Sequence, residues 1–191
     1  MNPLRPLLLT AAFAAASLST RAAEPVHSTG GHSPHETTSA VIGDRRTGNR
    51  VTITYGRPFT ADPKTGEARK IWGALVPWDQ PWRLGADEAT LLLTQKPIVF
   101  GDTTIAAGAY TLYLVPSESG AKLVFSSNLG KWGVPVDTGH DVASVPMTKS
   151  ALAEPVHELT LNVENDAAAG GGVLRIKWES TEYSATFTVA K

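Results

Sequence analysis

The residues best suited to chemistry in this chain gather in one segment that is punctuated by glycine and proline. They are Arg57, Trp72, Trp82, Arg83, Asp87 and Glu88, with Trp78 among them. Indole rings can stack on a sugar ring or another flat ligand, while guanidinium and carboxylate groups fix its polar atoms. The segment therefore predicts a pocket for an unknown small molecule or glycan.

A structural role for the same residues is the alternative. Tryptophans of all-β proteins commonly lie in the core, and an arginine can stack on an indole ring such as that of Trp82. Gly85 lets the backbone fold back, so we expect a charge-assisted hydrogen bond from Arg83 to Asp87 or Glu88. Such a bond would hold an irregular loop whose backbone polar groups need partners. Function also concentrates in irregular loops on rigid scaffolds, so both interpretations stay open.

Familiar catalytic motifs do not occur. The chain has no Gly-x-Ser-x-Gly, Gly-x-Gly-x-x-Gly, P-loop or His-Glu-x-x-His pattern. The catalytic alternative is a hydrolase that acts on a carbohydrate-like substrate, with Glu88 as acid or base. Arg57 or Arg83 would then stabilise charge, and His140 is a further candidate. A glycosidase needs two facing carboxylates, whereas adjacent Asp87 and Glu88 point to opposite faces of an extended chain.

Metal and protease chemistry have weaker support. Asp137-Thr138-Gly139 matches the triplet of aspartic proteases, but those enzymes need two such aspartates, and the triplet is also common turn sequence. His27, His32 and His35 fall in a polar, aperiodic segment, and His140 falls in an expected loop. Structural metal sites need ligands in fixed geometry, so we expect solvated histidines, no metal site and no cofactor.

Strand patterns dominate the sequence that must position the candidate residues. Apolar and polar residues alternate with period two at residues 51–55, 159–163, 174–179 and 183–189. Residues 109–115 are apolar on both faces, which predicts a strand in the middle of a sheet. Short strands at this spacing predict an all-β fold, an antiparallel β-sandwich over residues 40–191, with barrel-like closure as the alternative.

The N-terminal residues predict export. Arg5 precedes an apolar run over residues 7–18, and small residues follow at Ala22 and Ala23, so we expect a signal peptide at residues 1–22. The run is shorter than the ~20 apolar residues that span a bilayer, so we expect no membrane insertion after cleavage. Residues 23–39 lack apolar periodicity, which predicts a disordered, dispensable leader. The mature protein should be soluble and periplasmic or extracellular, and the absence of cysteine means that it contains no disulfide.

Several sequence blocks resemble one family. They are Ser33-Pro34-His35-Glu36-Thr37, Thr54-Tyr55-Gly56-Arg57-Pro58, Ile71-Trp72-Gly73-Ala74-Leu75-Val76-Pro77, Trp82-Arg83-Leu84-Gly85-Ala86-Asp87-Glu88-Ala89-Thr90, Ala107-Gly108-Ala109-Tyr110-Thr111-Leu112 and Asn128-Leu129-Gly130-Lys131-Trp132-Gly133. Together they resemble a family of exported bacterial proteins catalogued as domain of unknown function 2911. That family usually has asparagine at the position of Asp87. The resemblance implies export and a β-rich fold, and it implies no activity.

Composition narrows the function further. A chain of 191 residues without an internal repeat predicts a single domain, and with a net charge of −1 no basic excess points to nucleic acid as a partner. We expect a non-enzymatic binding or interaction module whose site is the loop at residues 82–88. The extracytoplasmic hydrolase remains the alternative, so the sequence leaves open whether the protein is an enzyme.

Overall fold

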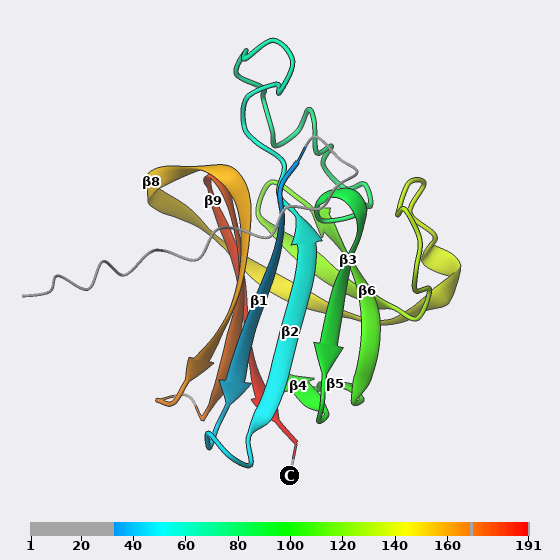
Figure 1. The fold of residues 1–191 in the computed structure, drawn as a ribbon, viewed down its shortest axis with the longest axis vertical. Helices are drawn as coiled ribbons and strands as arrows, with labels where there is room; N and C mark the ends of the chain where they lie inside the picture. Colours follow the sequence, from blue (N-terminus) through cyan, green and yellow to red (C-terminus); the bar gives the residue numbers. More distant parts are fainter. Residues whose placement is uncertain (1–32, 169, 191) are drawn as a thin grey trace, which may run out of the picture.

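The computed structural model describes residues 33–168 and 170–190, which form one antiparallel sheet of nine strands (Figure 1). The strands are β1 (His35–Ile42), β2 (Asn49–Gly56), β3 (Ala86–Thr94), β4 (Ile98–Phe100), β5 (Thr103–Ile105), β6 (Gly108–Pro116), β7 (Gly120–Ser126), β8 (Asp141–Asp166) and β9 (Gly171–Val189). One 3₁₀ turn, η1 (Thr138–His140), precedes β8. Within the described residues no helix is long and apolar enough to cross a membrane. The predicted all-β class is confirmed.

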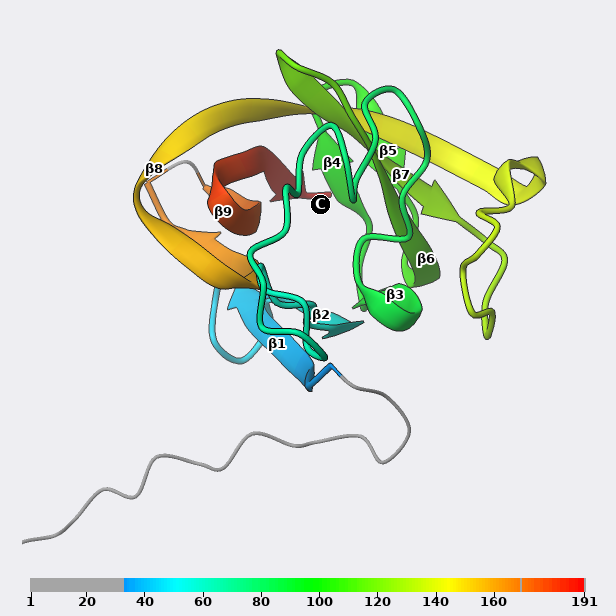
Figure 2. The same cartoon turned by 90° about the horizontal axis from the view of Figure 1, so that it is seen from above.

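The sheet bends over itself to enclose the core. Its strand order is β1-β2-β3-β6-β7-β8-β9-β4-β5, and the long strands β8 and β9 curve strongly when seen from above (Figure 2). The middle of β8 thereby meets the chain beyond β2, where the Leu159 N–H donates to Pro58 O at 2.9 Å and the Thr60 N–H donates to His157 O at 2.7 Å. The two layers form the predicted sandwich. β1 and β5 remain the two ends of the sheet, so the alternative of a closed barrel is wrong.

Alternating side chains create the core, as the sequence pattern predicts. β2 buries Val51, Ile53 and Tyr55 while Thr54 faces solvent, because successive side chains of a strand point to opposite faces. β6 pairs with β3 on one side and β7 on the other. Leu112 and its neighbours are buried on both faces of β6, so the prediction of an internal strand at residues 109–115 is confirmed.

The predicted leader ends earlier than expected. Residues 35–39 form the first part of β1, which pairs antiparallel with β2 from His35 opposite Gly56 to Ile42 opposite Asn49. The prediction of disorder through residue 39 is therefore wrong for these residues. Backbone hydrogen bonds to β2 define this edge strand, whose polar side chains carry no apolar alternation for the sequence to reveal. The predicted signal peptide and residues 23–32 lie outside the described residues.

An irregular segment at residues 57–85 connects β2 to β3 and rises above one end of the sheet (Figure 1). Two backbone hydrogen bonds of 2.8 Å tie Trp82 to Leu114 on β6. Trp72 packs against the rings of Trp78, Trp82, Trp178 and Tyr183, with centroids 5.2–6.2 Å apart. The segment is therefore anchored by aromatic packing and a short bridge to the sheet, which supplies the rigid support that a binding loop needs.

Candidate functional site

The segment at residues 57–85 encloses a cavity of about 650 Å³ together with the start of β3 and the loop at residues 133–136. The lining includes Trp82, Arg83 and Asp87 from the predicted site, and Phe59, Arg69, Leu75, Val134 and Trp178 from elsewhere. Three of the six residues predicted to contact a ligand therefore line this one cavity. The sequence missed Arg69 and assigned Trp178 only to a strand.

Two glycines allow the walls of this cavity to approach one another. A Cβ at Gly56 would lie 2.2 Å from Ala86 O, so only glycine permits the contact between the end of β2 and the start of β3. Gly133 has φ +81°, and a Cβ there would meet Ala89 Cβ at 2.9 Å and Arg83 Cβ at 3.1 Å. These close contacts explain why glycine follows Tyr in the Tyr-Gly-Arg-Pro block and follows Trp in the Lys-Trp-Gly block.

Arg83 is held by backbone carbonyls and an aromatic ring. Its Nε donates to Gly85 O at 3.2 Å, and its Nη1 donates to Trp132 O at 3.3 Å. The guanidinium carbon lies 5.5 Å from the centre of the Trp132 ring. The expected hydrogen bond to Asp87 or Glu88 is absent, so that prediction is wrong. Burial lowers the pKa of Arg83, and the negative charges of Asp87 and Glu88 partly offset this effect.

The two carboxylates instead face His35 at the start of β1. His35 Nε2 lies 2.9 Å from Glu88 Oε2 and 3.9 Å from Asp87 Oδ2. The pKa of Glu88 is lowered, first by its own backbone N–H and then by its hydrogen bond to His35. The expectation that His35 is a solvated leader residue is wrong. The Ser-Pro-His-Glu block was the signal in the sequence that could have located this contact.

Several buried polar atoms near the cavity have no hydrogen-bond partner. Arg69 Nε, Asp87 Oδ2 and Trp178 Nε1 are such atoms, and all three residues belong to the lining. Asp87 also has φ +60°, and Leu84 nearby has φ +59°. Residues other than glycine seldom adopt this left-handed conformation, and when they do they often mark a functional site. Asp87 therefore combines an unpaired buried polar atom with a strained backbone.

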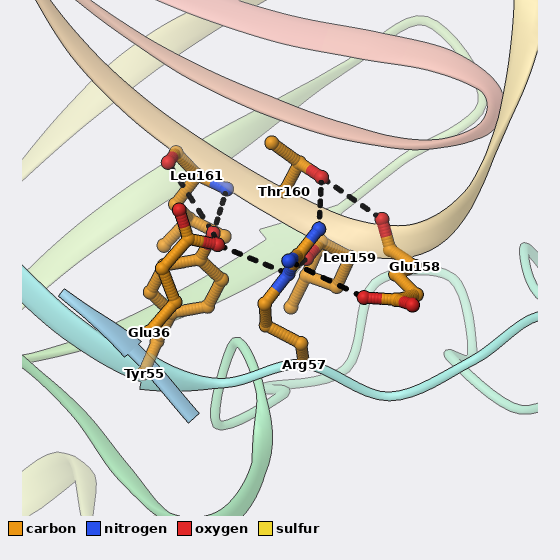
Figure 3. A network of polar contacts seen from close by, with 7 residues as sticks. All are labelled: Glu36, Tyr55, Arg57, Glu158, Leu159, Thr160 and Leu161. Atoms are coloured by element: carbon orange, nitrogen blue, oxygen red, sulfur yellow. Dashed lines mark hydrogen bonds and ion pairs between the residues drawn. The ribbon is translucent and has the colours of Figure 1, made fainter. Parts of the chain in front are cut away.

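Arg57 lies outside the cavity, in a network that ties β1, β2 and β8 together (Figure 3). Its Nε lies 3.1 Å from Glu36 Oε2 and donates to Leu159 O at 3.0 Å, and its Nη1 lies 3.3 Å from Glu158 Oε2. Its Nη2 donates to Thr160 Oγ1 at 3.1 Å. With its donors engaged in this way, Arg57 holds the β-sandwich together at the base of the segment.

Trp72 and His140 are also placed away from the cavity. Trp72 is buried in the aromatic cluster and does not line the hollow. His140 is exposed on η1, where its Nδ1 lies 3.0 Å from Asp137 Oδ2, and it makes no contact with Glu88. The alternative catalytic set of Glu88, Arg83 and His140 is therefore not assembled. No cluster of three or more potential ligands could hold a metal ion in the described part of the chain.

Comparison with known proteins gives one result. The chain matches the family described as "Protein of unknown function (DUF2911)" over residues 33–187, which include strands β1 to β8 and most of β9. No curated protein and no solved structure matches it.

Proposed function

The chain belongs to the DUF2911 family of proteins of unknown function, and we propose that it is a non-enzymatic binding module for a small organic molecule outside the cytoplasm. Its binding site is the cavity of about 650 Å³ above the sheet. Small-molecule sites commonly have volumes of about 300–1,000 Å³, with largely apolar walls and a few polar groups. The volume of this cavity and its mixture of apolar and charged lining residues therefore support binding.

The observation that carries the proposal is the presence of indole, guanidinium and carboxylate groups in one hollow. Trp82 supplies aromatic surface, and its ring stacks on that of the buried Trp178 with centroids 5.7 Å apart. Arg69, Arg83 and Asp87 supply the charged groups of the lining. An aromatic wall favours a flat or ring-shaped ligand, and the charged groups can fix the orientation of that ligand.

A purely structural role accounts for these groups less well. Roughly 90% or more of buried polar atoms in proteins have a hydrogen-bond partner, and an unpaired one costs about 1–3 kcal/mol. Arg69 and Asp87 each have such an atom. A ligand that bonded to these groups would remove that cost, whereas a role confined to packing leaves it uncompensated.

The geometry around Glu88 favours binding over hydrolysis. The Glu88 side chain is 61% exposed, does not line the cavity and has a lowered pKa. A general acid that works near neutral pH needs a raised pKa, which burial commonly provides. Glu88 lacks both features, so its contact with His35 is better explained as a link between β1 and β3.

Export is part of the proposal and depends on the sequence of residues 1–22, which has the pattern of a cleaved signal peptide. The mature chain should begin near Ala23 or Glu24. Cell fractionation followed by intact-mass measurement tests this directly. Recovery of the chain with Met1 in a membrane pellet would contradict the proposal.

Binding is tested by blocking the cavity from its rim. Leu75 lines the cavity and is 45% exposed, so Leu75→Trp should fill the hollow without removing a buried contact. Leu93 on β3 is 46% exposed and lines no part of it, so Leu93→Trp is the matched control. The probes are glucose, glucuronate, para-hydroxybenzamide, para-hydroxybenzoate and phenyl phosphate, and the assay is thermal unfolding with each.

A ligand present at 100 times its Kd stabilises the folded protein by about 2.7 kcal/mol, which raises Tm by roughly 5–10 °C for a domain of this size. We expect at least one probe to raise Tm in the wild type and in Leu93→Trp, and not in Leu75→Trp. Equal shifts in all three proteins would mean that binding occurs elsewhere. No shift with any probe would refute the proposed function.

A further inference from the structure

We infer that the ligand of this cavity carries an anionic group, either a carboxylate or a phosphate ester, together with a hydroxyl or amino group. This inference rests on the proposed function and specifies what the cavity binds. It follows from the charges of the lining and from the polar atoms that lack partners.

The charged residues of the lining favour an anion. They are Arg69, Arg83 and Asp87, which together leave one positive charge. Neither guanidinium lies within 4.0 Å of a carboxylate in residues 33–168 and 170–190. Buried or half-buried arginines are normally paired, because removing a cation from water is costly. The charge of Asp62 acts on Arg69, and those of Asp87 and Glu88 act on Arg83, only from beyond ion-pair distance. An anionic ligand would supply a counter-charge in direct contact.

The free donors support the same conclusion. Arg69 donates through Nη2 to Phe59 O, while its buried Nε has no partner. Arg83 donates from Nε and Nη1 to carbonyls, and arginine has further N–H groups on the same planar fork. The planar N–H donors of two arginines suit the oxygens of a carboxylate or phosphate.

Asp87 adds a second requirement. Its Oδ2 is buried without a hydrogen-bond partner, and His35 Nε2 lies 3.9 Å away, beyond hydrogen-bond distance. An ionised carboxylate only accepts hydrogen bonds, so the ligand must offer it an O–H or N–H donor. An anion without an O–H or N–H group does not satisfy both Arg69 and Asp87, whereas a hydroxylated or aminated organic acid does.

Matched probe pairs test the inference. Glucose and glucuronate differ by one carboxylate, as do para-hydroxybenzamide and para-hydroxybenzoate, and phenyl phosphate reports on phosphate esters. Isothermal titration calorimetry measures each Kd with the wild type, Arg69→Gln, Asp87→Asn and Arg50→Gln. Arg50 is exposed on β2 and lines no part of the cavity, so it is the matched control for loss of a positive charge.

We expect the acid of each pair to bind about 10- to 100-fold tighter than its neutral partner, the range of a charge-assisted hydrogen bond. Arg69→Gln should remove most of that preference and Arg50→Gln should leave it intact. Asp87→Asn should weaken the hydroxylated acids more than phenyl phosphate, which has no hydroxyl on its ring. Tighter binding of phenyl phosphate than of both acids, although it lacks the hydroxyl, would identify a phosphate ester as the preferred anion.

The outcomes separate this inference from the proposed function. If the neutral partners bind as tightly as the acids and Leu75→Trp blocks them, the cavity binds ligands but the anionic requirement is overturned. If the acids bind equally well to Arg69→Gln, Asp87→Asn and Leu75→Trp, the assignment to this cavity is overturned. If no probe binds, both conclusions fall. Leu75 is 45% exposed at the rim, so the test by Leu75→Trp stands even where Arg69→Gln lowers Tm.

Discussion

Tyr55→Phe and Tyr183→Phe make the same chemical change at two buried sites and should have opposite effects on stability. Tyr55 is 2% exposed, and its hydroxyl accepts the Leu161 N–H at 2.9 Å and donates to Glu36 Oε2 at 3.0 Å (Figure 3). Without that hydroxyl, the buried Leu161 N–H on β8 loses its partner. Glu36 keeps its ion pair with Arg57, so the loss of stability comes mainly from the unpaired Leu161 N–H.

Leaving a buried donor unpaired costs about 1–3 kcal/mol, so we expect Tyr55→Phe to lower the free energy of unfolding by about 2 kcal/mol. Tyr183 is fully buried, and its hydroxyl has no partner in the described residues. Tyr183→Phe removes an unpaired polar group, and we expect a change between zero and a gain of about 1 kcal/mol. The two variants should therefore differ by about 2–3 kcal/mol, because one hydroxyl is bonded and the other is not.

Urea unfolding measures this difference. With a slope of about 1–3 kcal/mol per molar urea, the two midpoints should be separated by roughly 1 M while the slope stays constant. Equal losses of stability in the two variants would refute the reasoning, because volume and aromaticity change identically. A stabilised Tyr55→Phe would show that the β2–β8 link does not depend on the hydroxyl.

Four further predictions follow from single contacts. Leu112→Ala on β6 should cost about 2–5 kcal/mol in urea unfolding, and a loss below ~1 kcal/mol would contradict the central place of this strand. Arg57→Met should cost about 2 kcal/mol and leave probe binding unchanged, because its guanidinium bonds to β8 and not to the cavity. Burial raises the pKa of Tyr183 to about 12, so the folded protein should lose stability as pH rises from about 10 through 12, and Tyr183→Phe should flatten that loss in pH-dependent melts. The pKa of Glu88 is lowered, so its contribution to stability is present above the unfolded pKa and lost in acid. Glu88→Gln should reduce the difference in the free energy of unfolding between about pH 7 and pH 3, by no more than about 1 kcal/mol for so exposed a group, as measured by urea unfolding.

The strands were the most predictable part of the fold. Alternation at β2 and β9 predicts which side chains enter the core, because a half-buried strand must place its apolar residues with period two. The stretch around Leu112 is apolar on both faces of the strand, which likewise predicts an internal strand. The start of β1 shows no alternation of apolar and polar residues, because residues 35–39 are all polar. That edge strand forms through backbone hydrogen bonds to β2, which any sequence without proline can make.

The candidate site was predictable in part. Local composition pointed to Trp82, Arg83 and Asp87, which do line one cavity. The same composition pointed to Arg57, although its guanidinium binds residues of β8 about a hundred positions away. Arg69 and Trp178 gave no separate signal, because an arginine in a loop and a tryptophan in a strand are ordinary in isolation. His35 was assigned to a leader, although it contacts Glu88 across β1 and β3.

The sequence by itself determined the class of fold, the inward-facing residues of most strands and the segment that carries the candidate ligand contacts. These features depend on local spacing, and local spacing is set by backbone geometry that is the same in every strand. Only the tertiary structure decided which arginine supports the fold and which faces the cavity. It also brought β9, the loop at residues 133–136 and the start of β3 around one hollow. That arrangement follows from how the curved sheet bends over itself, a property of all nine strands together that no single stretch of sequence specifies.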